Sequence, residues 1–128
     1  GDINSYNALP EKYQKNITVI KSGHHGAKYT VNNQMANNSQ IFILSTGHNS
    51  YNHPHAETIK TIIENNRVYL RTDRSNAIKI TMKPKKLEHE QLCRTDESTI
   101  SCKTGLEIFH YSPKYKKFEK IPDFMLLN

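Results

Sequence analysis

Two short apolar runs dominate the hydrophobic pattern of the chain. Residues 17–21 and 41–45 are β-branched, aliphatic or aromatic at nearly every position, which is typical of strands buried on both faces of a sheet. Residues 67–71 are predicted to form a shorter third strand. Residues 77–82 alternate apolar and polar side chains, which predicts a fourth strand with one face in the core.

Helical patterns separate these predicted strands. A short helix is expected over residues 7–15, with Tyr13 facing inward. A loop and a short helix are expected in the polar stretch that contains Val31 and Met35. A third helix is expected after Pro54, with Thr58 and Lys60 facing solvent. The apolar residues at helical spacing in this third helix are Ile59, Ile62 and Ile63. Buried strands that alternate with helices predict an α/β layer structure.

The pattern changes from residue 83 onward. A charged segment leads to residues 106–111, in which apolar and polar side chains alternate as they do in a strand. Residues 115–121 are a candidate hairpin partner across the turn at 112–114. This tail is interpreted as an antiparallel appendage on the α/β unit. Two parts are therefore expected, residues 1–82 and residues 83–128.

The charge balance favours polyanionic partners. The chain has 18 Lys and Arg against 12 Asp and Glu, a net charge of +6 with neutral histidines. Nucleic acid, anionic lipid and phosphorylated small molecules all suit such a surplus, although a plain basic surface explains it as well. No apolar run approaches the ~18 residues that a membrane span requires, and no signal peptide is visible. A soluble chain is expected, cytoplasmic by preference, or extracytoplasmic if it belongs to a channel protein.

The two cysteines are too few for a disulfide scaffold. Cys93 and Cys102 flank a polar stretch, where they would either pair across a hairpin or remain free thiols. A zinc site made from these two residues alone is not expected, since no further cysteine accompanies them.

Five of the seven histidines fall in two short loops, each directly after a predicted buried strand. They are His24 and His25 in the first loop, and His48, His53 and His55 in the second. In open α/β sheets, ligands bind beyond the carboxyl ends of the strands. Gly23 and Gly26 flank the first pair and would let the backbone turn sharply beside a ligand. Imidazoles there would bind a metal or shuttle protons, or else would be structural, with His53 and His55 as helix caps.

Four sequence blocks, in order, resemble the second half of a metallo-β-lactamase-fold hydrolase. The blocks are Gly1-Asp2-Ile3; Val19 to Lys28, including Ser22-Gly23-His24-His25-Gly26; Ile41 to Gly47 with Asn49, Tyr51 and His53-Pro54-His55; and Val68 to Asp73 with Ala77-Ile78. The subgroup that the chain resembles is the terminal domain of ComEC-type competence DNA-channel proteins and their soluble relatives. The phosphorylcholine-esterase branch of the same fold is also similar.

The resemblance covers about residues 1–82. It implies the C-terminal half of an αββα sandwich, on which the β-rich extension of residues 83–128 is expected to pack. The family's first metal motif, a His-x-His-x-Asp-His loop, lies upstream in such proteins and is absent here. A missing N-terminal half of the fold is therefore expected as a partner, and self-association of the chain is an alternative way to cover its sheet.

The resemblance also implies roles for individual residues. Asp2 would be the carboxylate that bridges two divalent metal ions, zinc or manganese, and His25 would be a ligand of the second ion. His24 and His53 would be catalytic and would contact the substrate phosphate, with His53 as a proton donor. Lys28 is expected to help bind substrate. His48, His89 and His110 are interpreted as structural.

These roles define the predicted function. The intact protein would be a metal-dependent hydrolase of phosphodiester bonds, a nuclease or phosphodiesterase acting on DNA or on a phosphorylated small molecule. This chain would carry only part of the dinuclear site and would be inactive alone. The alternative is a degenerate, non-catalytic domain of the same fold that binds nucleic acid, and a further alternative is an unrelated α/β domain.

Overall fold

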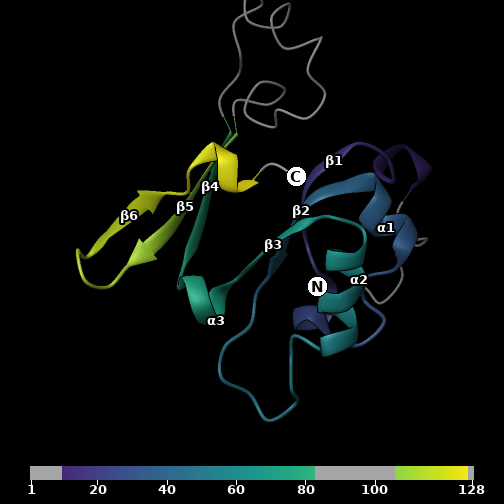
Figure 1. Cartoon of the computed structure of the whole chain (residues 1–128), viewed down its shortest axis with the longest axis horizontal. Coiled ribbons are helices and arrows are strands. Elements are labelled where there is room, and N and C mark those ends of the chain that lie inside the picture. The colour runs from purple at the N-terminus through teal and green to yellow at the C-terminus, as the bar shows by residue number, and fades with distance from the viewer. Residues whose placement is uncertain (1–9, 83–105, 127–128) are drawn as a thin grey trace, which may run out of the picture. The chain divides into compact units, whose positions relative to one another are not determined.

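The computed structural model describes residues 10–82 and 106–126, apart from the side chains of residues 123 and 124 (Figure 1). The chain divides into two compact units between Arg74 and Ser75. Both units contain strands and short helical segments, and the α-helices α1 (Asn33–Asn38) and α2 (Ala56–Glu64) lie in the first, so the chain has the mixed α/β character expected from its sequence. In the described ranges no helix is long and apolar enough to cross a membrane.

The first unit contains a three-stranded parallel sheet. Strand β2 lies between β1 and β3, and both neighbours run parallel to it. The strands are β1 (Ile17–Lys21), β2 (Ser39–Leu44) and β3 (Val68–Arg71). The three strands predicted for residues 17–21, 41–45 and 67–71 are thus confirmed. Every residue of β2 except Gln40 is buried, whereas β1 is only partly buried, so the expectation that both were fully buried is wrong for β1. Being at the edge, β1 has one strand neighbour where β2 has two.

Helices α1 (Asn33–Asn38) and α2 (Ala56–Glu64) supply the core on one face of this sheet (Figure 1). Phe42 and Leu44 point to the same face of β2, because side chains alternate along a strand. They form one buried cluster with residues of α1 and α2, namely Met35, Ala36 and Ile62. The core therefore fixes both helices against the sheet, and with them the loops at the strand ends.

The inward face of α2 differs from the prediction in two positions. Thr58 is 1% exposed, and its hydroxyl donates a hydrogen bond of 2.8 Å to the Ala27 carbonyl. Ile63 is 54% exposed. Thr58 and Ile62 lie one turn apart and share the inward stripe, so the adjacent Ile63 falls on the solvent side. Thr58, whose hydroxyl has a hydrogen-bond acceptor, therefore occupies a buried position that the pattern predicted for Ile63.

Residues before β1 form a tighter turn than predicted. The described part of the expected helix over residues 7–15 is a 3₁₀ helix, η2 (Glu11–Tyr13), and residues 7–9 lie outside the described range. The Tyr13 amide donates to the Pro10 carbonyl, at 2.8 Å. Tyr13 is 57% exposed, so its predicted inward position is wrong.

The second unit contains a three-stranded antiparallel sheet in the order β4-β5-β6. The strands are β4 (Ile78–Met82), β5 (Leu106–Ser112) and β6 (Lys117–Lys120); the short helices α3 (Thr72–Ser75) and η4 (Asp123–Leu126) flank them in sequence. The predicted hairpin after residue 112 is confirmed, since β5 pairs with β6. Strand β4, which the sequence assigned to the first part, pairs with β5.

Candidate functional site

The two histidine-bearing loops meet because β1 and β2 are adjacent and parallel. Their carboxyl ends lie at the same edge of the sheet, and backbone hydrogen bonds join the segments that follow. The Ser22 amide donates to the Ile43 carbonyl at 3.0 Å, and the His55 amide donates to the Gly26 carbonyl at 2.8 Å. The clustering expected from the sequence is therefore built into the backbone of the first unit.

The first loop is a tight turn with an unusual backbone. In η3 (Gly23–Gly26), His24 and His25 have φ of 44° and 56°, and Gly26 has φ of 78°. A Cβ at Gly26 would lie 2.9 Å from the Cβ of Pro54. Glycine is therefore required at position 26, because the backbone there is left-handed and because it lies close to the second loop. Non-glycine residues in this region cost about 1–3 kcal/mol each and cluster at functional sites.

The orientation of His25 is set by one hydrogen bond. Its Nδ1 lies 2.8 Å from the Ser45 carbonyl oxygen. A carbonyl only accepts, so Nδ1 carries the proton and donates. In the neutral ring Nε2 then carries the lone pair. Histidines that bind metals generally fix their other nitrogen in this way, so His25 has the geometry of a metal ligand.

Three imidazoles and a phenol ring lie close together at this edge. The ring centroid of His24 is 5.7 Å from that of His53 and 6.5 Å from that of His25. The Tyr51 ring lies 5.9 Å from His53. Burial of the His53 ring, and then the nearby His24 and His25, hold the pKa of His53 below its usual value. The neutral form of the His53 imidazole is thereby favoured in the free protein.

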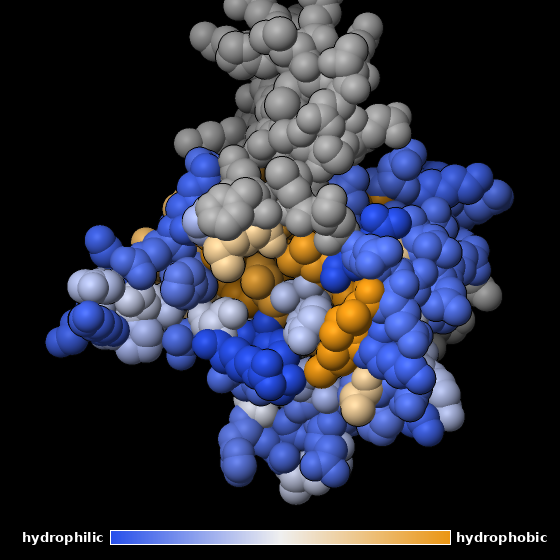
Figure 2. Space-filling view, viewed as in Figure 1, coloured by the Kyte–Doolittle hydropathy of each residue, from blue (hydrophilic) through white to orange (hydrophobic). Residues whose placement is uncertain are grey.

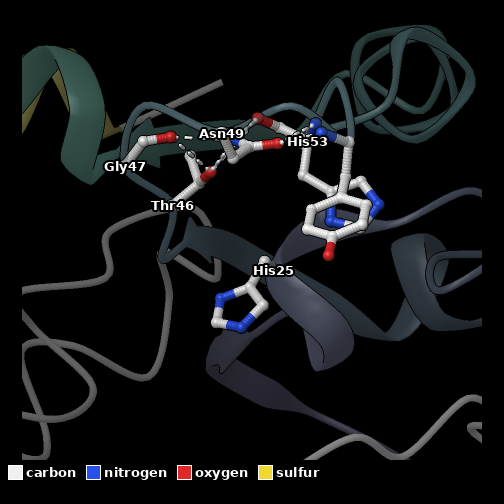
Figure 3. Close-up of a pocket in the computed structure, with 6 residues that line it drawn as sticks. His25, Thr46, Gly47, Asn49 and His53 are labelled. Atoms are coloured by element: carbon white, nitrogen blue, oxygen red, sulfur yellow. Dashed lines mark hydrogen bonds between the residues drawn. The ribbon is translucent and has the colours of Figure 1, made fainter.

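Asn49 organises the second loop (Figure 3). Its Oδ1 accepts hydrogen bonds from the backbone amides of Tyr51 and His53, at 3.1 and 3.0 Å. Its Nδ2 donates to the carbonyls of Gly47 and His53, both at 2.8 Å, and to the Thr46 hydroxyl at 3.1 Å. The Asn49 side chain thus forms hydrogen bonds with both ends of the loop and fixes the position of the His53 backbone.

A pocket of about 220 Å³ lies between these groups. Figure 3 shows His25 on one side of it and the loop of residues 46–53 on the other. The pocket is lined by His25, Thr46, Gly47, Asn49, Tyr51 and His53. Since one water takes up about 30 Å³ in the liquid, this space holds a group the size of a phosphate together with several waters.

The structure brings together three of the predicted site residues. His25 and His53 line the pocket, and His24 lies against His53. Lys28 is exposed, with its Nζ 4.8 Å from the centre of the Tyr29 ring, and is not among the pocket-lining residues. Asp2 lies outside the described residues, as do His89, Cys93 and Cys102.

The other histidines of the described ranges, His48, His55 and His110, do not line the pocket. The His55 Nδ1 accepts from the Glu57 amide at 3.2 Å and caps α2, as one of the two interpretations from the sequence proposed. His48 is exposed and does not line the pocket. Sequence reasoning missed Thr46, Asn49 and Tyr51 as site residues. Their position directly after a strand that ends beside the His24-His25 loop was the signal available.

The residues present fit a metal site only in part. In residues 10–82 and 106–126 no group of three or more His, Cys, Asp or Glu side chains is placed to hold a metal ion. His25 offers one well-oriented nitrogen, and a zinc site requires at least three protein ligands. The remaining ligands of any metal would have to come from outside these ranges, Asp2 included.

Comparisons with protein-family models, with curated proteins and with solved structures find no match for this chain.

Proposed function

We propose that this chain forms the second half of a metallo-β-lactamase-like αββα domain in a metal-dependent hydrolase of phosphodiester bonds. The substrate is DNA or a phosphorylated small molecule. The observation that carries the proposal is the convergence of His25 and His53, from the ends of two successive parallel strands, on one pocket. The resemblance of residues 1–82 supplies the reaction class.

His25 would hold a divalent ion through Nε2, together with Asp2. The hydrogen bond from Nδ1 to Ser45 supports this role, because it leaves Nε2 as the nitrogen with the lone pair. Two zinc or manganese ions, when bound, supply an activated water and neutralise phosphate charge. The rest of the ligand set would be contributed by the first half of the fold.

His53 and His24 would bind the phosphate. In the free protein burial of the ring, and then the neighbouring imidazoles, lower the pKa of His53. A phosphate oxygen bound next to the ring favours the protonated form of His53. His53 would therefore gain a proton as substrate binds and donate it to the leaving oxygen. General acid catalysis of this kind contributes about 10²–10⁴-fold to the rate.

Hydrolysis of a thymidine dinucleotide, whose alkoxide leaving group requires a proton, tests the proposal. The protein expressed from its complete coding sequence is assayed with Mn²⁺ or Zn²⁺, next to the 128-residue chain alone. We expect turnover by the intact protein, with losses of about 100-fold or more in kcat for His25→Ala and His53→Ala. His48→Ala is the matched control, since His48 is exposed in the same loop as His53 and lies outside the pocket.

Two results would overturn this function. The first is robust turnover by the chain alone that survives His25→Ala, since another site would then perform the chemistry. The second is an intact protein that binds DNA but hydrolyses no phosphodiester with either metal, which would favour the non-catalytic binding domain.

A further inference from the structure

The antiparallel sheet of the second unit has two chemically different faces. In the register of the sheet, Lys79 lies opposite Phe109, and Tyr111 lies opposite Phe118. Side chains directly opposite each other share a face, so these four residues belong to one side, which we call the aromatic face. The alternate positions of β5, Leu106 and Ile108, are buried on the other side.

The aromatic face remains accessible. Phe118 is 39% exposed, and Lys79 is exposed as well. The rings of Tyr111 and Phe118 meet edge to face, with centroids 5.5 Å apart. The Lys79 ammonium lies 4.4 Å from the Phe109 ring centre and 5.0 Å from that of Phe118. The flexible, cationic side chain of Lys79 thus lies over two of these rings, and Glu107 on the same face pairs with Lys120 at 3.5 Å.

The hairpin tip repeats this pairing of cation and ring. Tyr115 is 57% exposed, and the Nζ atoms of Lys114 and Lys117 lie 5.1 and 5.7 Å from its ring centre. Figure 2 shows a predominantly hydrophilic surface at this end of the hairpin, at the left of the view. Lys116 adds a further cation to the turn, and Glu119 is the one carboxylate of β6.

We propose that the aromatic face and the adjoining hairpin tip bind single-stranded nucleic acid. Aromatic rings on an open sheet stack unpaired bases, and lysines beside them contact the phosphates. When a base stacks on Phe118, the Lys79 side chain would swing from the ring to a phosphate. This site is separate from the histidine pocket and does not depend on hydrolysis there.

The pairing of rings with cations favours a single strand over other polyanions. Duplex DNA keeps its bases stacked inside, so a duplex would use the lysines but not the rings. An anionic lipid surface would likewise attract the lysines by charge alone. The prediction is therefore a preference for single strands that depends on Phe118.

Fluorescence anisotropy with a labelled dT15 oligonucleotide tests this inference, in a chelator so that no metal-dependent cleavage occurs. The full chain is compared with Phe118→Leu, which keeps an apolar side chain, and with Tyr115→Ser at the exposed tip. We expect each change to weaken binding about tenfold. Lys79→Gln should reduce the slope of log K against log salt by about 0.7.

The matched control is Lys12→Gln. The Lys12 ammonium also covers an aromatic ring, with 4.7 Å to the centre of Tyr13, but it belongs to the other unit; its replacement should leave dT15 affinity within about twofold. Equal binding of dT15 and a 15-base-pair duplex, or unchanged affinity in both Phe118→Leu and Tyr115→Ser, would overturn the proposal. Because binding is measured without metal, this result is independent of whether the histidine pocket hydrolyses phosphodiesters.

Discussion

Replacement of Gly26 by alanine should destabilise the first unit severely. Gly26 has a φ of 78°, where an L-amino acid with a side chain pays about 1–2 kcal/mol. The added Cβ would also lie 2.9 Å from the Pro54 Cβ and 3.4 Å from the Leu44 Cδ2. Forcing an extra methyl group into a packed site costs about 1–3 kcal/mol.

The two effects act together at Gly26. The left-handed backbone and the contact with Pro54 are independent, so we expect a loss of about 2–5 kcal/mol in the free energy of unfolding. A typical domain has only about 5–15 kcal/mol in total. The change should therefore lower the urea midpoint markedly and weaken the contact between the two histidine loops.

Urea unfolding followed by circular dichroism measures this loss. Gly47→Ala is the matched control, because Gly47 is in the second loop, has no atom within 4 Å of an added Cβ and no left-handed backbone. Its stability should stay within about 0.5 kcal/mol of the wild type. If Gly26→Ala also stays within this range, the two loops do not pack as described, and the convergence of the histidines loses its physical basis.

Three further predictions concern the groups that hold the site. Asn49→Ala removes five hydrogen bonds of the second loop; it should raise the pKa of His53 toward its ordinary value in an NMR titration, whereas Ser50→Ala should not. Thr58→Val should cost about 1 kcal/mol in urea unfolding, since it leaves the Ala27 carbonyl without that donor; no loss would mean that burial alone places Thr58. The Arg71 guanidinium, at 3.0 and 2.6 Å, holds the pKa of the Asp73 carboxyl below its usual range. That stabilisation is complete above the unfolded pKa of about 3.9 and is lost as pH falls through the folded pKa. Asp73→Asn should therefore cost about 0.5–1 kcal/mol at pH 7 and almost nothing near pH 2; an equal loss at both pH values would exclude the ion pair as the cause.

The strands and the meeting of the two loops could be predicted because they depend on local pattern. Residues 17–21 and 41–45 are apolar enough to specify strands on their own. Once two such strands are adjacent and parallel, the loops that follow them must meet at one edge. The positions of His25 and His53 at that edge followed from this topology.

Other features depend on contacts between distant segments, which a local pattern does not contain. Thr58 is buried because the Ala27 carbonyl accepts its hydrogen bond across a separation of 31 residues. Strand β4 belongs to the second sheet because it pairs with residues 106–112, far along the chain. The left-handed backbone of His24 and His25 could not be predicted from their residue types, because histidine adopts it more often than most residues but still in a minority of cases.

Calorimetric titration with Zn²⁺ tests the central claim most directly. It is performed on the protein expressed from its complete coding sequence, with His25→Ala and the control His48→Ala. We expect about two zinc ions to bind per chain. His25→Ala should weaken the binding of one ion by about 10-fold or more, whereas His48→Ala should leave the binding of both unchanged. Zinc binding that is absent from the intact protein, or that is identical in His25→Ala and the wild type, would contradict this claim.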